Sequence, residues 1–319
     1  MINRRSLLAC AASLPLPALA QNAAWPERPL RLIVPFPPGG AIDAMARILA
    51  TPMAEALGQA VVVENRAGAG GTTGTGVAAQ TTDGHSLLMV SIAHAVNPAL
   101  YPRLPYAEVD FVPVGPVAVV PNILVLPASR PWRSVAEVIA EARRRPGALT
   151  YASAGSGTSI HLAGALFADL AGLTLEHVPY RGSAPAVTDL VAGRVDMMFD
   201  SVTSAGPHIA SGRLMALAVT TSQRIASFPD LPTMTEAGVP GAVVDPWFAM
   251  LAPRALPIAA RPSLSSLLSR LLADTAIIER LTRIGAAPMK GDAGTLAHLL
   301  TEETARWGAF IQRAGIKPE

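Results

Sequence analysis

Short apolar runs alternate with segments of helical spacing along almost the whole chain. The runs are mostly β-branched and are bounded by glycine, proline or polar residues, which is typical of buried strands. They occupy residues 29–34, 61–64, 86–90, 122–126, 149–152, 175–179, 195–199 and 214–220. Strands that alternate with helices in this way indicate an α/β fold with mainly parallel sheets.

Capping residues mark where several of the predicted helices begin. Ser134 and Glu137 form a capping box before a helix that ends ahead of Pro146. Pro52 should kink or shorten the first helix, whose apolar face begins at Ile42. The other predicted helices are one capped by Thr158 or Ser159 that runs to Gly172, one capped by Ser183 that ends at Gly193, and the longer segments 262–284 and 294–314.

Two long apolar segments indicate that the chain crosses between two lobes. Residues 113–127 and 243–253 are extended and are punctuated by proline rather than by helix signals. Two crossings would build lobe 1 from residues 25–122 plus 248–319 and lobe 2 from residues 123–247. Because ligands of open α/β sheets bind outside the carboxyl ends of the strands, the lobes would face each other across a ligand cleft.

The first residues of the chain have the features of an export signal. Arg4-Arg5 gives the charged start, residues 7–19 are apolar, and Ala18-Leu19-Ala20 is a cleavage site. The same segment partly matches a twin-arginine signal and, at residues 7–10, a lipoprotein box. We expect cleavage after Ala20, which removes Cys10, the only cysteine.

Composition and charge exclude several kinds of partner. Only 5% of the residues are aromatic, too few to suggest a stacking platform for nucleic acid. Without Arg4 and Arg5 the chain has 23 basic and 23 acidic residues, so no basic surface is expected either. The six histidines include no pair at the spacing of metal ligands. The glycine-rich stretch 68–74 has Thr73 where a dinucleotide-binding fingerprint needs glycine or alanine, so we expect neither metal nor cofactor.

The loop Phe36-Pro37-Pro38-Gly39-Gly40 carries the clearest binding signal. It follows a predicted strand and precedes a helix. Prolines fix the path of the loop, and glycines allow a ligand to approach the backbone closely. The free N–H groups at residues 39–42 would open a helix N-terminus, which is a ready anion site. The loop contains no nucleophile, so it favours binding over catalysis.

A second loop, at residues 153–159, has the same strand–loop–helix arrangement in lobe 2. It follows a predicted strand, begins a helix, and supplies hydroxyl and N–H groups. Together the two loops would hold a carboxylate at each end of a small molecule, using helix dipoles rather than lysine or arginine. Two alternatives stay open at this point. One is that both loops are only helix caps. The other is that Ser156 and His161 form the catalytic pair of an exported α/β hydrolase, although no serine has G-x-S-x-G spacing.

Ordered motifs along nearly the whole mature chain resemble the Bug family, the periplasmic receptors of tripartite tricarboxylate transporters. In lobe 1 they are Trp25-Pro26-Glu27-Arg28-Pro29-Leu30-Arg31, Val34-Pro35-Phe36-Pro37-Pro38-Gly39-Gly40, Val62-Val63-Glu64-Asn65-Arg66, Gly68-Ala69-Gly70-Gly71, Asn97-Pro98 and Leu104-Pro105-Tyr106. In lobe 2 they are Tyr151-Ala152-Ser153, Gly155-Ser156-Gly157-Thr158, Val178-Pro179-Tyr180-Arg181-Gly182-Ser183-Ala184-Pro185-Ala186 and Glu236-Ala237-Gly238.

The resemblance implies a two-lobed type II periplasmic binding fold without catalytic activity. It also implies that the ligand is a small carboxylate, such as a dicarboxylate, an acidic amino acid or an aromatic acid. The implied partners are the membrane subunits of a tripartite tricarboxylate transporter, or a sensor ectodomain if the protein is an orphan receptor. The implied location is the periplasm, and nothing in the sequence requires more than a monomer.

The resemblance also implies the binding residues. The first loop contributes Phe36, Pro38, Gly39 and Gly40, with Asp43 at the helix start. Because an acidic side chain facing an anion is unfavourable, we expect Asp43 to bind N–H groups, water or an amino group of the ligand. The opposite loop contributes Ser153, Ser156, Gly157, Thr158 and His161. Residues that follow other predicted strands are expected to line the same cleft, namely Ser91, His94, Asp200 and Ser201.

Overall fold

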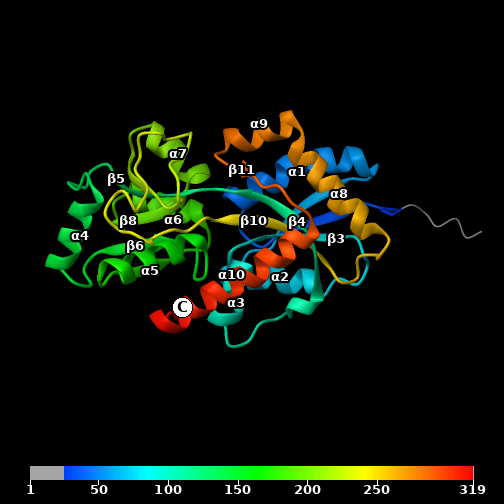
Figure 1. Ribbon diagram of the computed structural model, residues 1–319, viewed down its shortest axis with the longest axis horizontal. Helices are drawn as coiled ribbons and strands as arrows, with labels where there is room; N and C mark the ends of the chain where they lie inside the picture. The colour runs from blue at the N-terminus through cyan, green and yellow to red at the C-terminus, as the bar shows by residue number, and fades with distance from the viewer. Residues whose placement is uncertain (1–24, 319) are drawn as a thin grey trace, which may run out of the picture.

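Two β-sheets with helices packed against them lie side by side in the computed structural model, which describes residues 25–318 (Figure 1). The first sheet has six strands in the order β11-β4-β10-β3-β1-β2, and the second has five in the order β7-β6-β8-β5-β9. We call the two halves lobe 1 and lobe 2. The expected export signal, residues 1–20, lies outside the described residues.

Lobe 1 draws its sheet from both ends of the described chain. Its strands are β1 (Leu30–Val34), β2 (Val61–Asn65), β3 (Ser86–Ser91), β4 (Phe111–Val119), β10 (Trp247–Pro253) and β11 (Ala287–Pro288). β1 runs parallel to β2 and β3, whereas β10 runs antiparallel to β3 and β4. The helices are α1 (Ala41–Leu57), α2 (Thr72–Ala79), α3 (Ala93–Leu100), α8 (Ala260–Ala273), α9 (Thr275–Arg283) and α10 (Ala293–Ala314), with 3-10 turns η1 (Ala69–Gly71) and η2 (Glu108–Asp110).

Lobe 2 is continuous in sequence. Its strands are β5 (Asn122–Pro127), β6 (Thr150–Ser153), β7 (Glu176–Pro179), β8 (Met197–Ser201) and β9 (Leu214–Val219). β6 runs parallel to β7 and β8, and β5 runs antiparallel to β8 and β9. The helices are α4 (Val135–Arg144), α5 (Ser159–Ala171), α6 (Ser183–Val191) and α7 (Val202–Ala210).

The expectation of mainly parallel sheets is wrong, because both sheets are mixed. The segments predicted to cross between lobes are themselves strands: residues 113–127 fall within β4 and β5, and residues 243–253 include β10. β5 and β10 enter their sheets directly from the other lobe, without a crossover helix, and both pair antiparallel to their neighbours.

Three helix predictions need correction. α1 is not shortened at Pro52 but continues to Leu57, and Leu49 and Met53 on either side of the proline are both fully buried. The segment 262–284 forms two helices, α8 and α9, since Asp274 is extended and its side chain accepts the N–H groups of Ala276 and Ile277. Ser183 is not the cap of α6. That position is Gly182, which has no side chain to offer.

The last helix, α10, packs against α3 and β4 and ties β10 into lobe 1 (Figure 1, red). The carboxylate Oε2 of Glu303 accepts the indole N–H of Trp247 at 3.0 Å and that of Trp307 at 2.9 Å. Trp307 is 1% exposed and lies in the largest cluster of buried apolar side chains.

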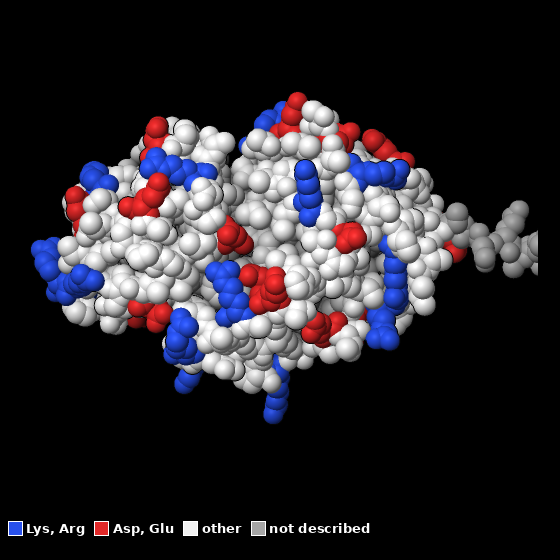
Figure 2. All heavy atoms as spheres, in the orientation of Figure 1, with Lys and Arg blue, Asp and Glu red and all other residues white. Residues whose placement is uncertain are grey.

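No helix within residues 25–318 has the length and apolarity needed to span a membrane. Figure 2 shows basic and acidic side chains scattered over the visible face, with neither sign gathered into a broad patch.

Candidate ligand-binding site

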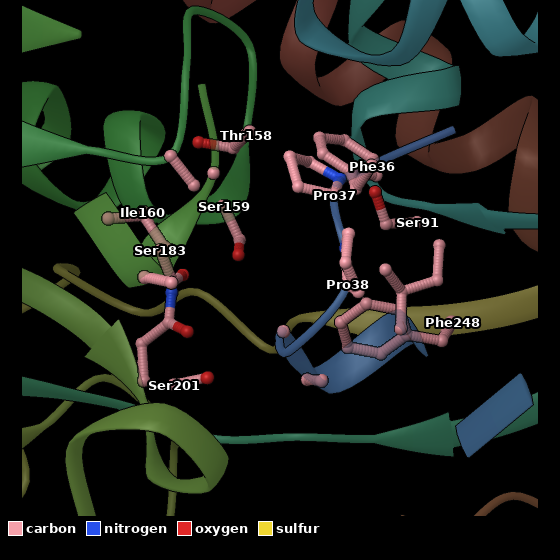
Figure 3. Close-up of a pocket in the computed structure, with 17 residues that line it drawn as sticks. Phe36, Pro37, Pro38, Ser91, Thr158, Ser159, Ile160, Ser183, Ser201 and Phe248 are labelled. Atoms are coloured by element: carbon pink, nitrogen blue, oxygen red, sulfur yellow. The ribbon is translucent and has the colours of Figure 1, made fainter. Parts of the chain in front are cut away.

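A cavity lies between the two lobes, where loops from both sheets meet (Figure 3). It contains about 620 Å³ of space free of atoms, part of which is open solvent. Lobe 1 lines it with Phe36, Pro37, Pro38, Gly40, Ala41, Ile42, Ser91 and Phe248, and lobe 2 with Asn122, Ala154, Thr158, Ser159, Ile160, Gly182, Ser183, Ala184 and Ser201. Within the described part of the chain, no lysine, arginine, aspartate or glutamate lines this cavity.

Four helices begin at the cavity. α5 and α7 are capped by side chains, because Thr158 accepts the N–H of His161 and Ser201 accepts the N–H of Ser204. α1 and α6 begin after Gly40 and Gly182, which provide no capping side chain. The first N–H groups of α1 and α6 are therefore available to a ligand, and the positive ends of the helix dipoles favour an anion.

Asp43 braces the first loop and does not line the cavity. Its carboxylate accepts the N–H of Gly39 at 3.1 Å, the amide of Asn65 at 2.9 Å and the guanidinium of Arg47 at 3.1 Å. Asn65 also donates to the carbonyl oxygen of Phe36 at 3.0 Å. Burial raises the pKa of Asp43, but the hydrogen bonds from Arg47, Asn65 and Gly39 outweigh burial and leave the pKa below its ordinary value. The bond to Gly39 agrees with our expectation that Asp43 binds N–H groups.

The second loop is held by a similar set of internal bonds. The hydroxyl of Thr158 donates to the carbonyl of Gly155 at 2.8 Å. Nδ1 of His161 accepts the N–H of Gly157 at 3.1 Å, and the hydroxyl of Ser153 lies 2.7 Å from Nε2 of His177. The rings of His161 and His177 stack with their centroids 4.1 Å apart. Ser153, Gly157 and His161 therefore stabilise the loop behind the cavity, while Thr158 reaches the cavity itself.

Ser156 and His161 are not arranged as a catalytic pair. Ser156 Oγ is buried without a hydrogen-bond partner among the described residues, and it belongs to a neighbouring cavity that also includes Gly70 and Arg181. Nδ1 of His161 already accepts a backbone N–H, so Nε2 carries the ring proton. Burial, together with the nearby His177, lowers the pKa of His161 to about 3. Neither ring nitrogen is therefore free to activate the serine.

Ser91 and His94 follow the same strand but lie in different places. Ser91 ends β3 and lines the main cavity. His94 stacks on Tyr106 at 5.5 Å and meets the edge of Phe111 at 5.7 Å, beside a separate small cavity behind Phe36. Burial lowers the pKa of His94 to about 4, so this ring is neutral at physiological pH.

Asp200 is completely buried one layer behind the lobe 2 side of the cavity. It accepts the hydroxyl of Ser183 at 2.9 Å and the hydroxyl of Ser204 at 2.6 Å. Burial raises its pKa to about 6, although the hydrogen bonds from Ser204, Ser183 and the backbone of Ser201 act in the opposite direction. Asp200 thus supports two helix starts rather than facing the cavity.

The structure separates the predicted site residues into two groups. Those on the cavity surface are Phe36, Pro38, Gly40, Ser91, Thr158 and Ser201. Those that hold the walls from behind or lie beside another cavity are Gly39, Asp43, His94, Ser153, Ser156, Gly157, His161 and Asp200. Sequence reasoning missed other lining residues, chiefly Asn122, Gly182, Ser183 and Phe248. The motif around Gly182 was a usable signal, because it places a glycine and a serine at a helix start.

Comparison with known proteins identifies the chain. Residues 45–316 match the family described as the tripartite tricarboxylate transporter family receptor. The chain belongs to this family. A protein from the tcbD-tcbE intergenic region of Pseudomonas sp. (strain P51) is 46% identical over 291 residues, which cover 90% of this chain and 87% of that protein. The predicted resemblance to Bug receptors is thereby confirmed at the level of the family.

Solved structures of similar proteins agree with the fold. An R. palustris protein in a structure with adipate is 36% identical, with a TM-score of 0.89 over 92% of this chain and 100% of that one. The periplasmic binding protein BugD is 35% identical, with a TM-score of 0.86 over the same shares. These similarities confirm the predicted two-lobed periplasmic binding fold. The family consists of solute-binding receptors rather than enzymes, so the hydrolase alternative is wrong.

Proposed function

We propose that this protein captures a small carboxylate in the cavity between its lobes. The observation that carries the proposal is that two uncapped helix starts, at Gly40 and Gly182, border one cavity, and that no charged side chain of residues 25–318 lines it. Helix N-termini favour anions without needing a cationic side chain. The adipate in the similar R. palustris structure supports the same class of ligand, since adipate is a dicarboxylate.

The two uncapped helices suggest how such a ligand is held. One carboxyl group would accept the N–H groups of Ala41 and Ile42 at the start of α1, and the other would accept those of Ser183 and Ala184 at the start of α6. Each hydrogen bond to a charged group contributes about 1.5–3 kcal/mol. A few such bonds suffice for micromolar affinity, about −8 kcal/mol. The apolar rings of Phe36, Pro38 and Phe248 would cover the hydrocarbon part between the carboxyl groups.

Contacts between the lobes support capture by closure. A methyl group placed on Gly182 of lobe 2 would lie 3.0 Å from Cγ of Pro37 in lobe 1. The carbonyl of Ser156 approaches Gly70 still more closely. Only backbone without side chains fits at these points, so the lobes can close tightly around a ligand and exclude water.

The family suggests the role of the closed form. We propose that the chain is exported to the periplasm with cleavage near Ala20, and that it acts as a monomer. Its closed form would then be recognised by the membrane subunits of a tripartite tricarboxylate transporter. An orphan receptor that presents its ligand to a sensor ectodomain is the alternative. Uptake of labelled ligand by a strain lacking the gene distinguishes the two, because only a transport receptor is needed for uptake.

A thermal-shift screen tests the binding proposal. The protein is unfolded and refolded to remove any ligand, then heated with each member of a panel of mono- and dicarboxylates. A ligand at 100 times its dissociation constant stabilises the folded protein by about 2.7 kcal/mol, enough to raise the midpoint by several degrees. A shift by at least one carboxylate, with no product formed, is the expected result. A panel without any shift would overturn the carboxylate assignment.

A further inference from the structure

Asp200 fixes the direction of two hydroxyl groups on the lobe 2 side of the cavity. The hydroxyl of Ser183 donates its proton to Oδ1 of Asp200 at 2.9 Å, and the hydroxyl of Ser204 donates to Oδ2 at 2.6 Å. The backbone N–H of Ser201 also points to this carboxylate. A carboxylate surrounded by three donors is held as an acceptor, so the proton of Ser183 is not available to a ligand.

The same carboxylate also fixes Ser201, through Ser204. The oxygens of Ser201 and Ser204 lie 2.8 Å apart. Because Ser204 gives its only hydroxyl proton to Asp200, the proton between the two serines must come from Ser201. Ser201 Oγ also accepts the N–H of Ser204 at 3.3 Å as the cap of α7, which leaves one lone pair for the cavity.

Ser183 and Ser201 both line the cavity (Figure 3), and both can only accept hydrogen bonds from a ligand. We call their two hydroxyl oxygens the acceptor pair. A carboxylate oxygen or a carbonyl oxygen placed against this pair would be repelled, because neither side has a proton to donate. The negative charge of Asp200 behind the pair would add to the repulsion. A hydroxyl or an ammonium group would instead donate to the pair.

Donors lie directly beside the acceptor pair. Asn122 is paired with Ser201 across strands β5 and β8, it lines the cavity, and it is 1% exposed. Its side-chain Nδ2 is buried and has no hydrogen-bond partner within the described residues. A buried donor without a partner is costly unless a ligand satisfies it. Together with the uncapped start of α6 at Ser183, Asn122 provides a place for a carboxyl group next to the acceptor pair.

We propose that the cavity selects carboxylates that carry a hydroxyl or ammonium group next to a carboxyl group, over carboxylates that have hydrogen or a carbonyl oxygen at that position. This inference rests on the proposed function and names the ligand class more narrowly. The carboxyl group would bind Asn122 and the start of α6, and the adjacent donor would bind Ser183 and Ser201. The specificity comes from Asp200, which has no contact with the ligand and acts by positioning the hydroxyl protons.

Matched ligands of equal length test the inference by isothermal titration of the refolded protein. The four-carbon series is succinate, malate and aspartate, and the five-carbon series is glutarate, 2-hydroxyglutarate, glutamate and 2-oxoglutarate. In the series that binds, the hydroxyl or ammonium compound should bind about tenfold or more tightly than the unsubstituted one. The affinity for 2-oxoglutarate should not exceed the affinity for glutarate. The affinity for malate compared with aspartate, and for 2-hydroxyglutarate compared with glutamate, shows whether a hydroxyl or an ammonium group is preferred.

Two variants show whether Asp200 is the cause. Ser204→Ala removes the acceptor of the Ser201 proton without touching the cavity surface, so the preference should fall several-fold while affinity for the unsubstituted acid is kept or improved. Asp200→Asn can donate to the serines and should abolish or reverse the preference. Thr188→Ala is the matched control, because it removes a hydroxyl of α6 that bonds only the carbonyl of Ala184.

Equal or tighter binding of the unsubstituted or 2-oxo acids by the wild type would overturn the inference while leaving the proposed function intact. A preference that survives Ser204→Ala in a protein with wild-type circular dichroism would overturn the assigned role of Asp200. Failure of every carboxylate to bind would overturn the proposed function, and the inference with it.

Discussion

Pro37 of lobe 1 and Gly182 of lobe 2 lie against each other, and both line the cavity between the lobes. A Cβ atom on Gly182 would lie 3.0 Å from Cγ and 3.2 Å from Cδ of the proline ring. Gly182 has a φ of +111°, so it is also a position where a side chain strains the backbone. The contact joins the first ligand loop to the start of α6, and hence joins the two proposed carboxylate sites.

We predict that Gly182→Ala weakens ligand binding more than it weakens the fold. The methyl group would hold Pro37 away and hinder closure of the lobes. Gly193→Ala is the control, because Gly193 has a φ of +72° in the same lobe, but a Cβ atom there would meet no atom of the described residues within 4 Å apart from its chain neighbours. In urea unfolding, Gly193→Ala should lose about 1 kcal/mol of stability and Gly182→Ala about 1–3 kcal/mol, because the φ of +111° and ψ of +168° at Gly182 are nearly restricted to glycine. Only Gly182→Ala should also raise the dissociation constant in isothermal titration, and equal affinities for the two variants would contradict the closure contact.

The carboxylate of Asp43 should be needed for the shape of the first loop. Asp43→Ala leaves the N–H of Gly39 and the amide of Asn65 without their partner, so we expect a loss of about 1–3 kcal/mol in the free energy of unfolding. Ligand affinity should fall as well, because the loop no longer presents the start of α1. Arg47→Ala is the control. Its side chain is 54% exposed, so its loss should cost less than about 1 kcal/mol. An Asp43→Ala protein with unchanged affinity would contradict the bracing role.

The local signals in the sequence pointed to the first loop and to the start of α5, and the structure has residues of both on the cavity surface. Pro38, Gly40 and Thr158 lie on the cavity surface because each belongs to a strand–loop–helix motif that is complete within a few residues. Phe248 and Asn122 could not be found in this way. They reach the cavity by antiparallel pairing with Ser91 and Ser201, which are far from them in the chain.

The sequence also could not tell which side chains of the loops face the cavity and which face away. Asp43, His161 and Asp200 were placed near the ligand because they follow strand ends. The structure turns each of them toward backbone N–H groups or serine hydroxyls. A buried polar group needs partners, and the nearest partners are in the loops themselves. These residues therefore shape the site from behind.

Three histidines should make the fold sensitive to acid, since His94 and His161 are buried and His177 is half-buried. Burial lowers the pKa of His94 and His177 to about 4, and burial with the nearby His177 lowers that of His161 to about 3. In the unfolded chain a histidine binds a proton near its ordinary pKa of about 6.5. Below that value the unfolded chain gains protons that the folded protein does not bind. The free energy of unfolding is therefore highest above about pH 6.5 and falls as the pH decreases towards 4. Asp200, with a pKa raised to about 6, opposes this loss in the lower part of the same range.

The variant His94→Phe tests this pH dependence. The ring stacks on Tyr106 and meets Phe111 at its edge, so phenylalanine keeps the packing and removes the titration. We expect the wild type to lose stability between about pH 7 and pH 5 in urea unfolding, and His94→Phe to lose about 2 kcal/mol less. The same loss in both proteins would show that His94 is accessible to protons in the folded state.

Binding of a small carboxylate at the start of α1 should be blocked by the variant Gly40→Leu. Among the described residues, a Cβ on Gly40 meets no atom within 4 Å apart from its chain neighbours, so we expect leucine at this cavity-lining position to occupy the space of the ligand. Gly206→Leu is the control, because a Cβ there likewise meets no atom of residues 25–318 outside its own helix within 4 Å, and Gly206 does not line the cavity. The measurement is isothermal titration of the refolded proteins with the carboxylate that gives the largest thermal shift. We predict one site per chain in the wild type and in Gly206→Leu, and at least a hundredfold loss of affinity, about 2.7 kcal/mol, in Gly40→Leu. Wild-type affinity in Gly40→Leu would place the ligand elsewhere and contradict the account.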